Sequence, residues 1–523
     1  MTTSDPSRRA GLREWAGLAV LALPCLLVSM DANVLGLALP ALTADLQPTS
    51  AQLLWIVDSY VFFVAGMLIT MGVLGDRIGR RRLLLIGGAA FGVASLLAAF
   101  STSPAMLIAA RAVLGVAGAT LMPSTLSLIR NMFTDPRQRT TAFGVWTASF
   151  AMGGVIAPLV AGLLLRHFWW GSVFLVAVPV IVLLLVFGPV LLPEFCNPDA
   201  TRIDLRSAAL SLIAVLAVVF GLKRLAQGGG EPTAVLSVAV GVVLAVAFVR
   251  RQRRQASPSM DLQLFRRRAF TMPLATNGLA FFVLYGSQLF VAQYLQLVLG
   301  LSALRAGLWT IPSAVAYLVG SVLGPMIANR VRPAVMLGSS LLVSAIGFGL
   351  LTQVRAASGL VVVVTGSVVL SLGLSPVYIV ATEMTISAAP PERAGAASAI
   401  LETCAELGGA LGIAVLGSIG AAVYRHSLPD VAPPGVNPEL WESARSTLGG
   451  AIAAAQRLPA RAGDELADEA RDAFTRGFQV AHTVGTAIIV VLAVASLLLL
   501  TRSELTSSRR EDPRPSAELQ RSQ

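Results

Sequence analysis

The sequence predicts an all-α protein that crosses a membrane many times, and three observations support this fold class. Of the 523 residues, 55% are hydrophobic and only 13% are charged, whereas about a quarter of the residues of a soluble domain are charged. Apolar runs of about 18 residues or more, long enough to span a bilayer as a helix, recur along the whole chain. Loops that contain many basic residues also alternate along the chain with loops that contain few.

The first apolar run, Trp15 to Leu39, follows three arginines. It is too long for the core of a signal peptide and lacks a convincing cleavage site, so we expect it to remain as the first transmembrane helix. Similar runs predict fourteen helices, at 15–39, 53–74, 83–100, 105–129, 142–165, 172–192, 206–226, 235–249, 270–299, 308–328, 334–352, 360–385, 397–423 and 479–501.

The loops between these helices predict the orientation. Of the 39 basic residues, 27 lie in the two tails and in the loops after even-numbered helices, and 5 lie in the short loops after odd-numbered helices. Basic residues favour the cytoplasmic side of a membrane. Both tails, 1–14 and 502–523, are therefore expected in the cytoplasm. The long polar segment 424–478 is then extracellular, where we expect it to form a helix-containing cap.

The net charge of +11 is explained by these cytoplasmic loops. The arginine runs at 250–255 and 266–268 are expected to contact anionic lipids rather than nucleic acid. Three cysteines and three histidines are scattered along the chain, so the sequence predicts no disulfide framework and no metal site.

Carboxylates occur inside the expected helices, where a charge costs at least about 2.5 kcal/mol on insertion scales. Asp31 lies nine residues before Pro40, hence about 13 Å below the outer end of its helix and close to the midplane. Asp58 lies nearer the outer side. Glu402 and Glu406 are one turn apart and share a helix face.

A carboxyl group in an apolar cavity can bind a proton and, once ionised, attract a cation. The residues expected to couple protons to cations are Asp31, Asp58, Arg111, Glu402 and Glu406. For each acid, a structural hydrogen bond or an ion pair with Arg111 remains the alternative.

The loop after the second helix reads GVLGDRIGRRRLL, from Gly72 to Leu84. Glycines let helix ends approach closely, and an aspartate can bond arginines or cap a helix N-terminus. We expect this segment to hold an inner gate closed through Gly72, Asp76, Arg77, Gly79, Arg80 and Arg81.

The fourth and fifth helices carry motifs of small residues. The fourth reads LIAARAVLGVAGA and places Arg111 one turn before Gly115. The fifth reads GGVIAPLVAG, in which small residues form a packing face and the proline allows a bend. The residues of this fifth-helix motif are Gly153, Gly154, Ala157, Pro158 and Gly162.

These motifs resemble the signatures of the major facilitator superfamily over residues 15–501. The helix 1 stretch MDANVLGLALPAL and the acid at position 58 resemble the fourteen-helix drug:proton antiporters, in the branch that exports quaternary ammonium compounds and other drugs. The resemblance implies that Arg111 takes part in proton coupling and that the fifth-helix motif marks an exporter, although Ala157 and Ala161 replace two glycines of that motif.

The same resemblance implies a domain organisation and a substrate cavity. Two six-helix bundles, 15–192 and 270–501, are expected on either side of two inserted helices at 206–249. Aromatic rings can hold organic cations by their faces. Candidate rings for the cavity are Tyr60, Phe63, Tyr285, Trp309 and Tyr317.

The expected function is proton-coupled export of lipophilic, cationic drugs, antiseptics or dyes across the bacterial cytoplasmic membrane. The expected partners are small amphiphilic substrates, protons and anionic lipids. The protein is expected to act as a monomer, to need no cofactor besides the proton gradient, and not to be an enzyme. An exporter of one antibiotic or endogenous metabolite, a proton symporter and a non-transporting scaffold remain alternatives.

Overall fold

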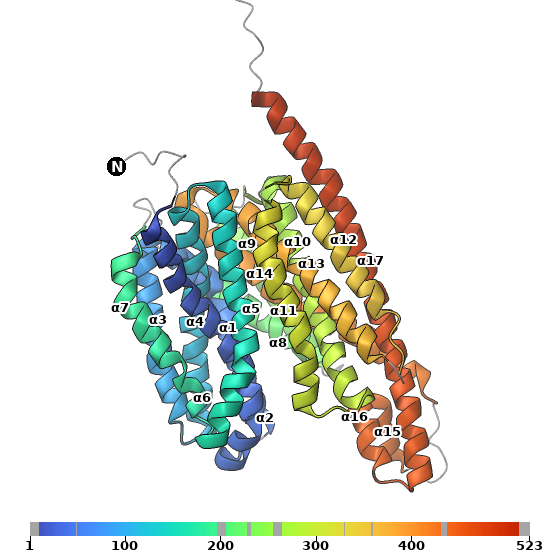
Figure 1. The fold of residues 1–523 in the computed structure, drawn as a ribbon. Helices are drawn as coiled ribbons and strands as arrows, with labels where there is room; N and C mark the ends of the chain where they lie inside the picture. The colour runs from blue at the N-terminus through green and yellow to red at the C-terminus, as the bar shows by residue number, and fades with distance from the viewer. Residues whose placement is uncertain are drawn as a thin grey trace, which may run out of the picture.

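The computed structural model describes residues 10–48, 50–195, 205–226, 232–254, 264–328, 330–356, 359–429 and 437–511. The secondary structure of these described residues consists of helices (Figure 1). Thirteen of the described helices are long and apolar enough to cross a membrane, and α8 (Leu205–Ala226) carries a shorter apolar stretch, Ala209–Leu222. All fourteen expected segments fall on these helices, so the predicted fold class is confirmed.

The first seven helices, here called the N-half, pack side by side (Figure 1). Two of them start with a proline in the first turn, behind Ser103 and Asp135, whose side chains accept backbone N–H groups. The helices are α1 (Leu12–Leu46), α2 (Ser50–Ile78), α3 (Arg80–Ala99), α4 (Pro104–Met132), α5 (Pro136–His167), α6 (Ser172–Leu175) and α7 (Ala177–Leu191).

The second bundle, here called the C-half, follows the short 3-10 helix η1 (Leu264–Arg266). Its first helix ends in a π-helical turn, and the 3-10 turn η3 (Pro391–Arg393) leads into α14. The elements are α10 (Arg268–Gln293) with the π turn η2 (Tyr294–Val298), α11 (Ala303–Ala328), α12 (Pro333–Leu351), α13 (Leu360–Ser387), α14 (Ala394–Ser427) and α17 (Ala460–Glu511).

The inserted helices α8 and α9 (Pro232–Arg254) pack against each other, and α8 contacts both halves. Phe62 and Ala65 of α2 form one apolar cluster with Val215 and Val219 of α8, against which α14 residues also pack. A Cβ atom at Gly66 would lie 2.4 Å from Leu212 Cδ1, so this glycine allows α8 to approach α2 closely. The insertion therefore covers one seam between the halves.

The described part of segment 424–478 contains helices, as expected for a helix-containing cap. It contains α15 (Pro438–Ser446) and α16 (Leu448–Ala455), and the last helix starts at Ala460 rather than at the expected 479. Trp441, Leu448 and Ala451 are buried. The Tyr424 hydroxyl, near the end of α14, donates to the Ala444 carbonyl over 2.7 Å. An apolar-run criterion misses these short helices because each buries only one face.

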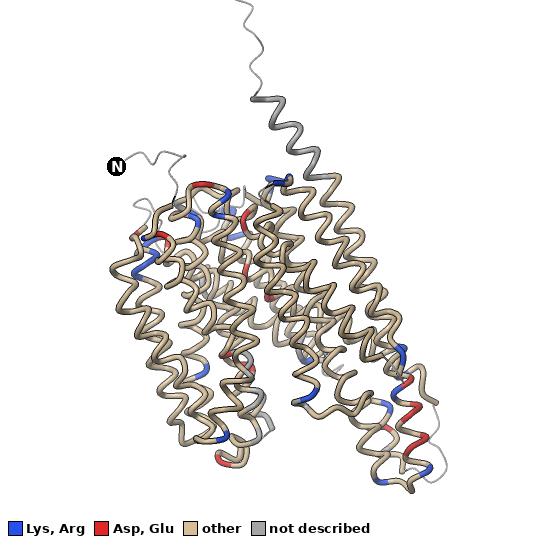
Figure 2. Tube along the Cα trace, viewed as in Figure 1, with Lys and Arg blue, Asp and Glu red and all other residues tan. Residues whose placement is uncertain are grey.

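Charged residues are concentrated toward the two ends of the bundle, and a few lie within it (Figure 2). The ribbons of the two halves approach each other at the end that carries the N-terminus and diverge toward the other end (Figure 1). Two regions bear on the function: the acids and arginines inside the bundle, and the end where the two halves meet.

Candidate functional site

Asp31 and Arg111 form an ion pair inside the N-half. Arg111 Nη1 lies 2.6 Å from Asp31 Oδ2, and the two side chains are 2% and 10% exposed. Arg111 Nε donates to the Ile56 carbonyl over 3.3 Å. The guanidinium carbon lies 4.6 Å from the centre of the Tyr60 ring. The buried arginine is therefore held by a carboxylate, a carbonyl and a ring face.

The glycines after Arg111 explain how α2 reaches it. A Cβ atom at Gly115 would lie 2.5 Å from the Tyr60 carbonyl oxygen and 2.8 Å from Phe63 Cβ. At Gly118 it would lie 3.3 Å from the Tyr60 hydroxyl. Both glycines lie on the same face of α4 as Arg111, at spacings of four and seven residues. The motif thus brings the Tyr60 ring under the guanidinium.

Asp31 also borders a small pocket between α1, α3 and the α6–α7 segment. Met30, Phe91 and Phe174 are among the apolar side chains that line this pocket. The carboxylate therefore has Arg111 and Tyr60 as neighbours and also reaches a space within the N-half.

A second acid centre lies in the C-half. The Tyr378 hydroxyl of α13 donates to Glu402 Oε1 of α14 over 2.9 Å, and both side chains are buried. The Tyr285 ring packs on Gly409, where an added Cβ atom would lie 2.4 Å from Tyr285 Cδ2. Gly409 shares a face of α14 with Glu402 and Glu406, so Tyr285 lies on the acidic face of that helix.

Two tyrosines, Tyr60 and Tyr317, lie near the charged residues of these two centres. Tyr60 is within electrostatic reach of Asp31 and Arg111 of the N-half and of Glu406 of the C-half. Tyr317 of α11 is within electrostatic reach of Glu402. The structure thus brings six predicted residues into one neighbourhood: Asp31, Tyr60, Arg111, Tyr317, Glu402 and Glu406.

The GVLGDRIGRRRLL segment joins the halves at the end that carries the N-terminus. Asp76 forms an ion pair with Arg80, and its Oδ2 accepts the Ala396 backbone N–H over 3.1 Å. That N–H belongs to the first turn of α14, where a negative charge is stabilising. A Cβ atom at Gly72 would lie 2.5 Å from Ala399 Cβ. Asp76 therefore caps a helix of the opposite half, as a closed gate requires.

Glu194, which the sequence analysis did not single out, holds this segment in shape. Its carboxylate accepts the backbone N–H groups of Arg81 and Arg82 at 3.0 and 3.1 Å, at the start of α3. Gly79 connects α2 and α3 with a φ of 106°, which glycine adopts readily. Glu194 lies 113 residues from Arg81, so its own stretch of sequence gave no signal for this contact.

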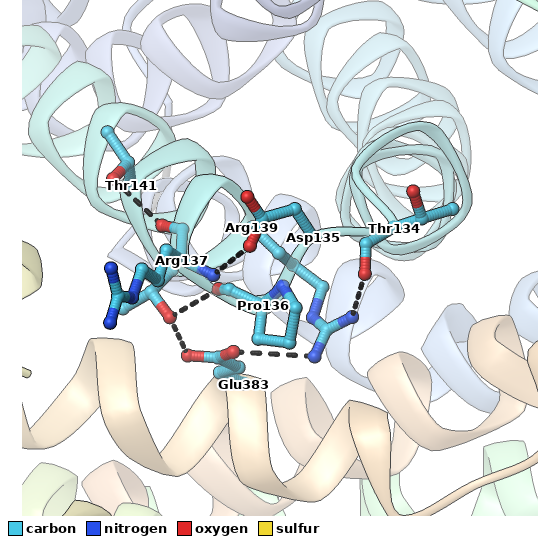
Figure 3. A network of polar contacts seen from close by, with 8 residues as sticks. Thr134, Asp135, Pro136, Arg137, Arg139, Thr141 and Glu383 are labelled. Carbon is cyan, nitrogen blue, oxygen red and sulfur yellow. Dashed lines mark hydrogen bonds and ion pairs between the residues drawn. The ribbon is translucent and has the colours of Figure 1, made fainter. Parts of the chain in front are cut away.

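Glu383 makes a second contact between the halves (Figure 3). It lies on α13 and accepts the Thr140 hydroxyl of α5. Arg139 Nη2 lies 3.5 Å from Glu383 Oε1. Asp135 caps α5 just before these residues and accepts the Arg137 N–H over 2.9 Å. The inner end of the molecule is thus held by two acids, one from each half.

Comparisons with known proteins agree with this geometry. The sequence profile described as "Major Facilitator Superfamily" matches residues 21–413. The chain belongs to the major facilitator superfamily. It is 44% identical to "Multidrug efflux pump LfrA" of Mycolicibacterium smegmatis over 94% of this chain and 96% of that protein. It is 34% identical to "Methyl viologen resistance protein SmvA" of Salmonella typhimurium over 94% of this chain and 99% of that protein.

A solved structure shows the same fold. The human organic anion transporter MFSD10 (TETRAN) matches with a TM-score of 0.58 at 15% identity, over 91% of this chain and 99% of that one. At that identity the likeness concerns the fold alone. This major facilitator is a multi-pass protein of the cytoplasmic membrane, and Asp76 and Glu383 join its two halves at the end that carries the N-terminus.

The fifth-helix motif of this major facilitator packs against α1. A Cβ atom at Gly153 would lie 2.5 Å from the Leu26 carbonyl oxygen, and Ala157 is fully buried. Gly162 has nothing within 4 Å of an added Cβ atom, and Gly154 is only partly buried. The side chain of Pro158 lies outside the described part. The packing face is therefore formed by positions 153, 157 and 161 rather than by the whole motif.

Three further expected residues lie apart from the acid centres. Asp58 is half-buried and shares a face of α2 with Phe62 and Ala65, which pack on α8, whereas Tyr60 lies on the opposite face. Trp309 lies in the second turn of α11 and is 44% exposed. Arg77 is exposed at the inner end of α2. The sequence showed how deep Asp58 lies in the membrane. It did not show which neighbours the face of α2 that carries Asp58 meets, because this depends on where the inserted helix α8 packs.

Replacing Glu383 with glutamine is expected to open the cytoplasmic end. The amide keeps the volume but loses the charge that pairs with Arg139, and a hydrogen bond to a charged group contributes about 1.5–3 kcal/mol. Hydrogen exchange of the α14 amides at 394–400 should therefore accelerate by about tenfold or more in Glu383→Gln. The measurement is hydrogen exchange with mass spectrometry on the full chain in lipid nanodiscs.

Glu465→Gln serves as the control, because Glu465 is exposed on α17 and pairs with Arg461 one turn earlier on the same helix. It should leave the exchange of 394–400 within about twofold of wild type. Equal exchange in Glu383→Gln and wild type would show that the Glu383 contact does not hold the halves together.

Proposed function

We propose that this major facilitator exports lipophilic cations from the cytoplasm in exchange for protons. The observation that carries the proposal is the presence of a buried acid in each half: Asp31 paired with Arg111, and Glu402 bonded to Tyr378. Keeping such groups in a membrane is expensive unless they act on an ion or a proton. The names of both relatives, a multidrug efflux pump and a methyl viologen resistance protein, agree with export of this substrate class.

The proposed cycle uses the two bundles 15–192 and 270–501 as rocking bodies. With the cytoplasmic end open, a cation binds near the midplane between Asp31 and the α14 acids, with the rings of Tyr60 and Tyr285 beside it. Closing the inner contacts opens the outer end. External protons then neutralise the acids, and the cation leaves because its charge partner is lost.

The Asp31 carboxylate has two alternative charge partners, Arg111 and a bound cation. While Asp31 is ionised, the arginine or a bound cation can neutralise it; once Asp31 is protonated, Arg111 keeps the Ile56 carbonyl and the Tyr60 ring. The buried guanidinium therefore stays solvated by the protein in each step. This makes repeated protonation of one buried carboxyl group feasible without leaving a bare charge.

Inverted membrane vesicles test the proposal directly. Their cytoplasmic face points outward, and respiration makes the lumen acidic and positive. We expect radiolabelled tetraphenylphosphonium, a monovalent lipophilic cation, to accumulate in the lumen of vesicles that contain the protein. A protonophore should abolish this accumulation, because it removes the proton gradient that drives exchange.

The alternatives give different results in the same assay. A symporter would move the cation out of the lumen along with protons, and a scaffold would behave like vesicles without the protein. Accumulation that persists after protonophore addition would contradict proton coupling. Repeating the assay with methyl viologen and with uncharged antibiotics separates a broad cation exporter from one dedicated to a single compound.

A further inference from the structure

The Glu402–Tyr378 pair is connected to the opposite half by a ring stack. Tyr378 lies on α13 of the C-half, and its ring stacks on Trp146 of α5 in the N-half. The ring centroids are 6.1 Å apart and the planes are inclined by 18°. Phe281 contacts the Tyr378 ring edge-on, with centroids 5.5 Å apart. One residue therefore bonds the buried acid with its hydroxyl and contacts the other half with its ring.

Trp146 is the fixed partner in this stack. It is 1% exposed, and its Nε1 donates to the Thr125 hydroxyl over 3.0 Å. Thr125 in turn donates to the Met122 carbonyl over 2.9 Å, and the Cys25 thiol donates to the Trp146 carbonyl over 3.3 Å. These bonds tie Trp146 to α4 and α1 of its own half. A change at Tyr378 therefore acts on the junction between the halves and not only within the C-half.

We propose that Tyr378 is a positioning residue that transmits the protonation state of Glu402 to the N-half through Trp146. This inference rests on the proposed antiport function. While Glu402 is ionised, it accepts the Tyr378 hydroxyl strongly and holds the ring on Trp146, so the halves stay joined as observed. A protonated Glu402 is a weaker acceptor, so Tyr378 is released and the stack loses its anchor.

This link between Glu402 and Trp146 would couple the return of the empty transporter to proton binding. An empty transporter with an ionised Glu402 stays locked with its cytoplasmic end closed, and only a protonated one returns to collect the next substrate. The other titratable side chains around Glu402 are Glu406 on the same helix, Cys25 on α1, Tyr285 on α10 and Tyr317 on α11. Among the described residues around Glu402, Tyr378 is the one that both donates a hydrogen bond to Glu402 and stacks on Trp146.

The test compares net efflux with exchange of labelled tetraphenylphosphonium in proteoliposomes at equal internal and external pH. Net efflux requires the empty protein to return, whereas exchange with the cation on both sides does not. For wild type, the ratio of net efflux to exchange should fall by about tenfold or more between about pH 6 and pH 8. For Tyr378→Phe, which keeps the ring but removes the donor, the ratio should change by less than about threefold.

Two further variants make the result specific. Tyr424→Phe removes a buried hydroxyl of the C-half that donates to the Ala444 carbonyl rather than to Glu402, and should keep the wild-type pH dependence. Trp146→Leu keeps the Glu402 bond but removes the stack, and should flatten the dependence as Tyr378→Phe does, so it replaces that variant if Tyr378→Phe does not fold. Reconstituted protein is checked by size-exclusion chromatography in each case.

The outcomes separate the two proposals. A steep ratio in wild type together with an equally steep ratio in Tyr378→Phe overturns the role of Tyr378 but leaves antiport intact. A wild-type ratio that is the same at every pH contradicts antiport itself and removes the basis of the inference. A flat ratio in Tyr424→Phe would show that the loss of any buried tyrosine hydroxyl of the C-half has the effect, which also overturns the assignment to Tyr378.

Discussion

Asp31→Asn is expected to reduce proton-coupled export to background while the protein still inserts into the membrane. Asparagine has nearly the same size but binds no proton and carries no negative charge, so neither the proton nor the cation finds its partner. Breaking a buried ion pair can destabilise a protein by about 3–5 kcal/mol. Here the Ile56 carbonyl and the Tyr60 ring still face Arg111 and reduce that loss. Vesicle accumulation of tetraphenylphosphonium measures export, and fluorescence-detected size-exclusion chromatography measures folding.

Asp45→Asn is the matched control for this change. Asp45 lies on the same helix, near its outer end, and accepts the Trp170 indole N–H over 2.7 Å. Losing its charge should leave export within about twofold of wild type, since the asparagine side-chain oxygen can still accept the indole N–H. Full export by Asp31→Asn would remove Asp31 from the mechanism.

Gly72→Ala is expected to prevent closure of the cytoplasmic end. The new methyl group would lie 2.5 Å from Ala399 Cβ and 2.7 Å from the Gly395 carbonyl oxygen, and neither atom belongs to a flexible side chain. Overpacking of this kind costs about 1–3 kcal/mol. Because the contact joins the two halves, this cost destabilises the closed state and not the open one. Export should fall by about tenfold, and hydrogen exchange of 394–400 should accelerate.

Gly162→Ala makes the same chemical change at a site with no atom within 4 Å of the added carbon. Export and exchange should match wild type, because alanine is favourable in a helix. If Gly72→Ala also behaved like wild type in both measurements, the close approach of α2 and α14 at Gly72 would not be part of the gate.

Local motifs allowed much of the site to be predicted from the sequence. The motif of the fourth helix placed Arg111 inside an apolar run, one turn before Gly115, and the depth of Asp31 indicated an intramembrane acid. The aspartate after α2 was expected to cap a helix N-terminus, and Asp76 accepts the Ala396 N–H. These features are encoded within a few turns of one helix, so periodicity and residue chemistry are enough to detect them.

Contacts between distant segments could not be predicted in the same way. Glu383 and Thr140 are 243 residues apart, and nothing near either residue indicates the other. Tyr378 was overlooked because a tyrosine in an apolar helix has no signature of its own; its role follows from the hydrogen bond to Glu402 on one side and the ring of Trp146 on the other. The direction of Asp58 likewise depends on where α8 packs.

The sequence by itself determined the transmembrane helices, the acids within them and the family motifs, because insertion energetics and helical periodicity act locally along the chain. The orientation indicated by the basic loops stays a prediction. Only the tertiary structure decided which acid meets which partner: Asp31 meets Arg111, Glu402 meets Tyr378, and Asp76 and Glu383 join the two halves at the end that carries the N-terminus. The reason is physical, since a helix presents several faces and packing against other helices selects the face that each charged side chain uses.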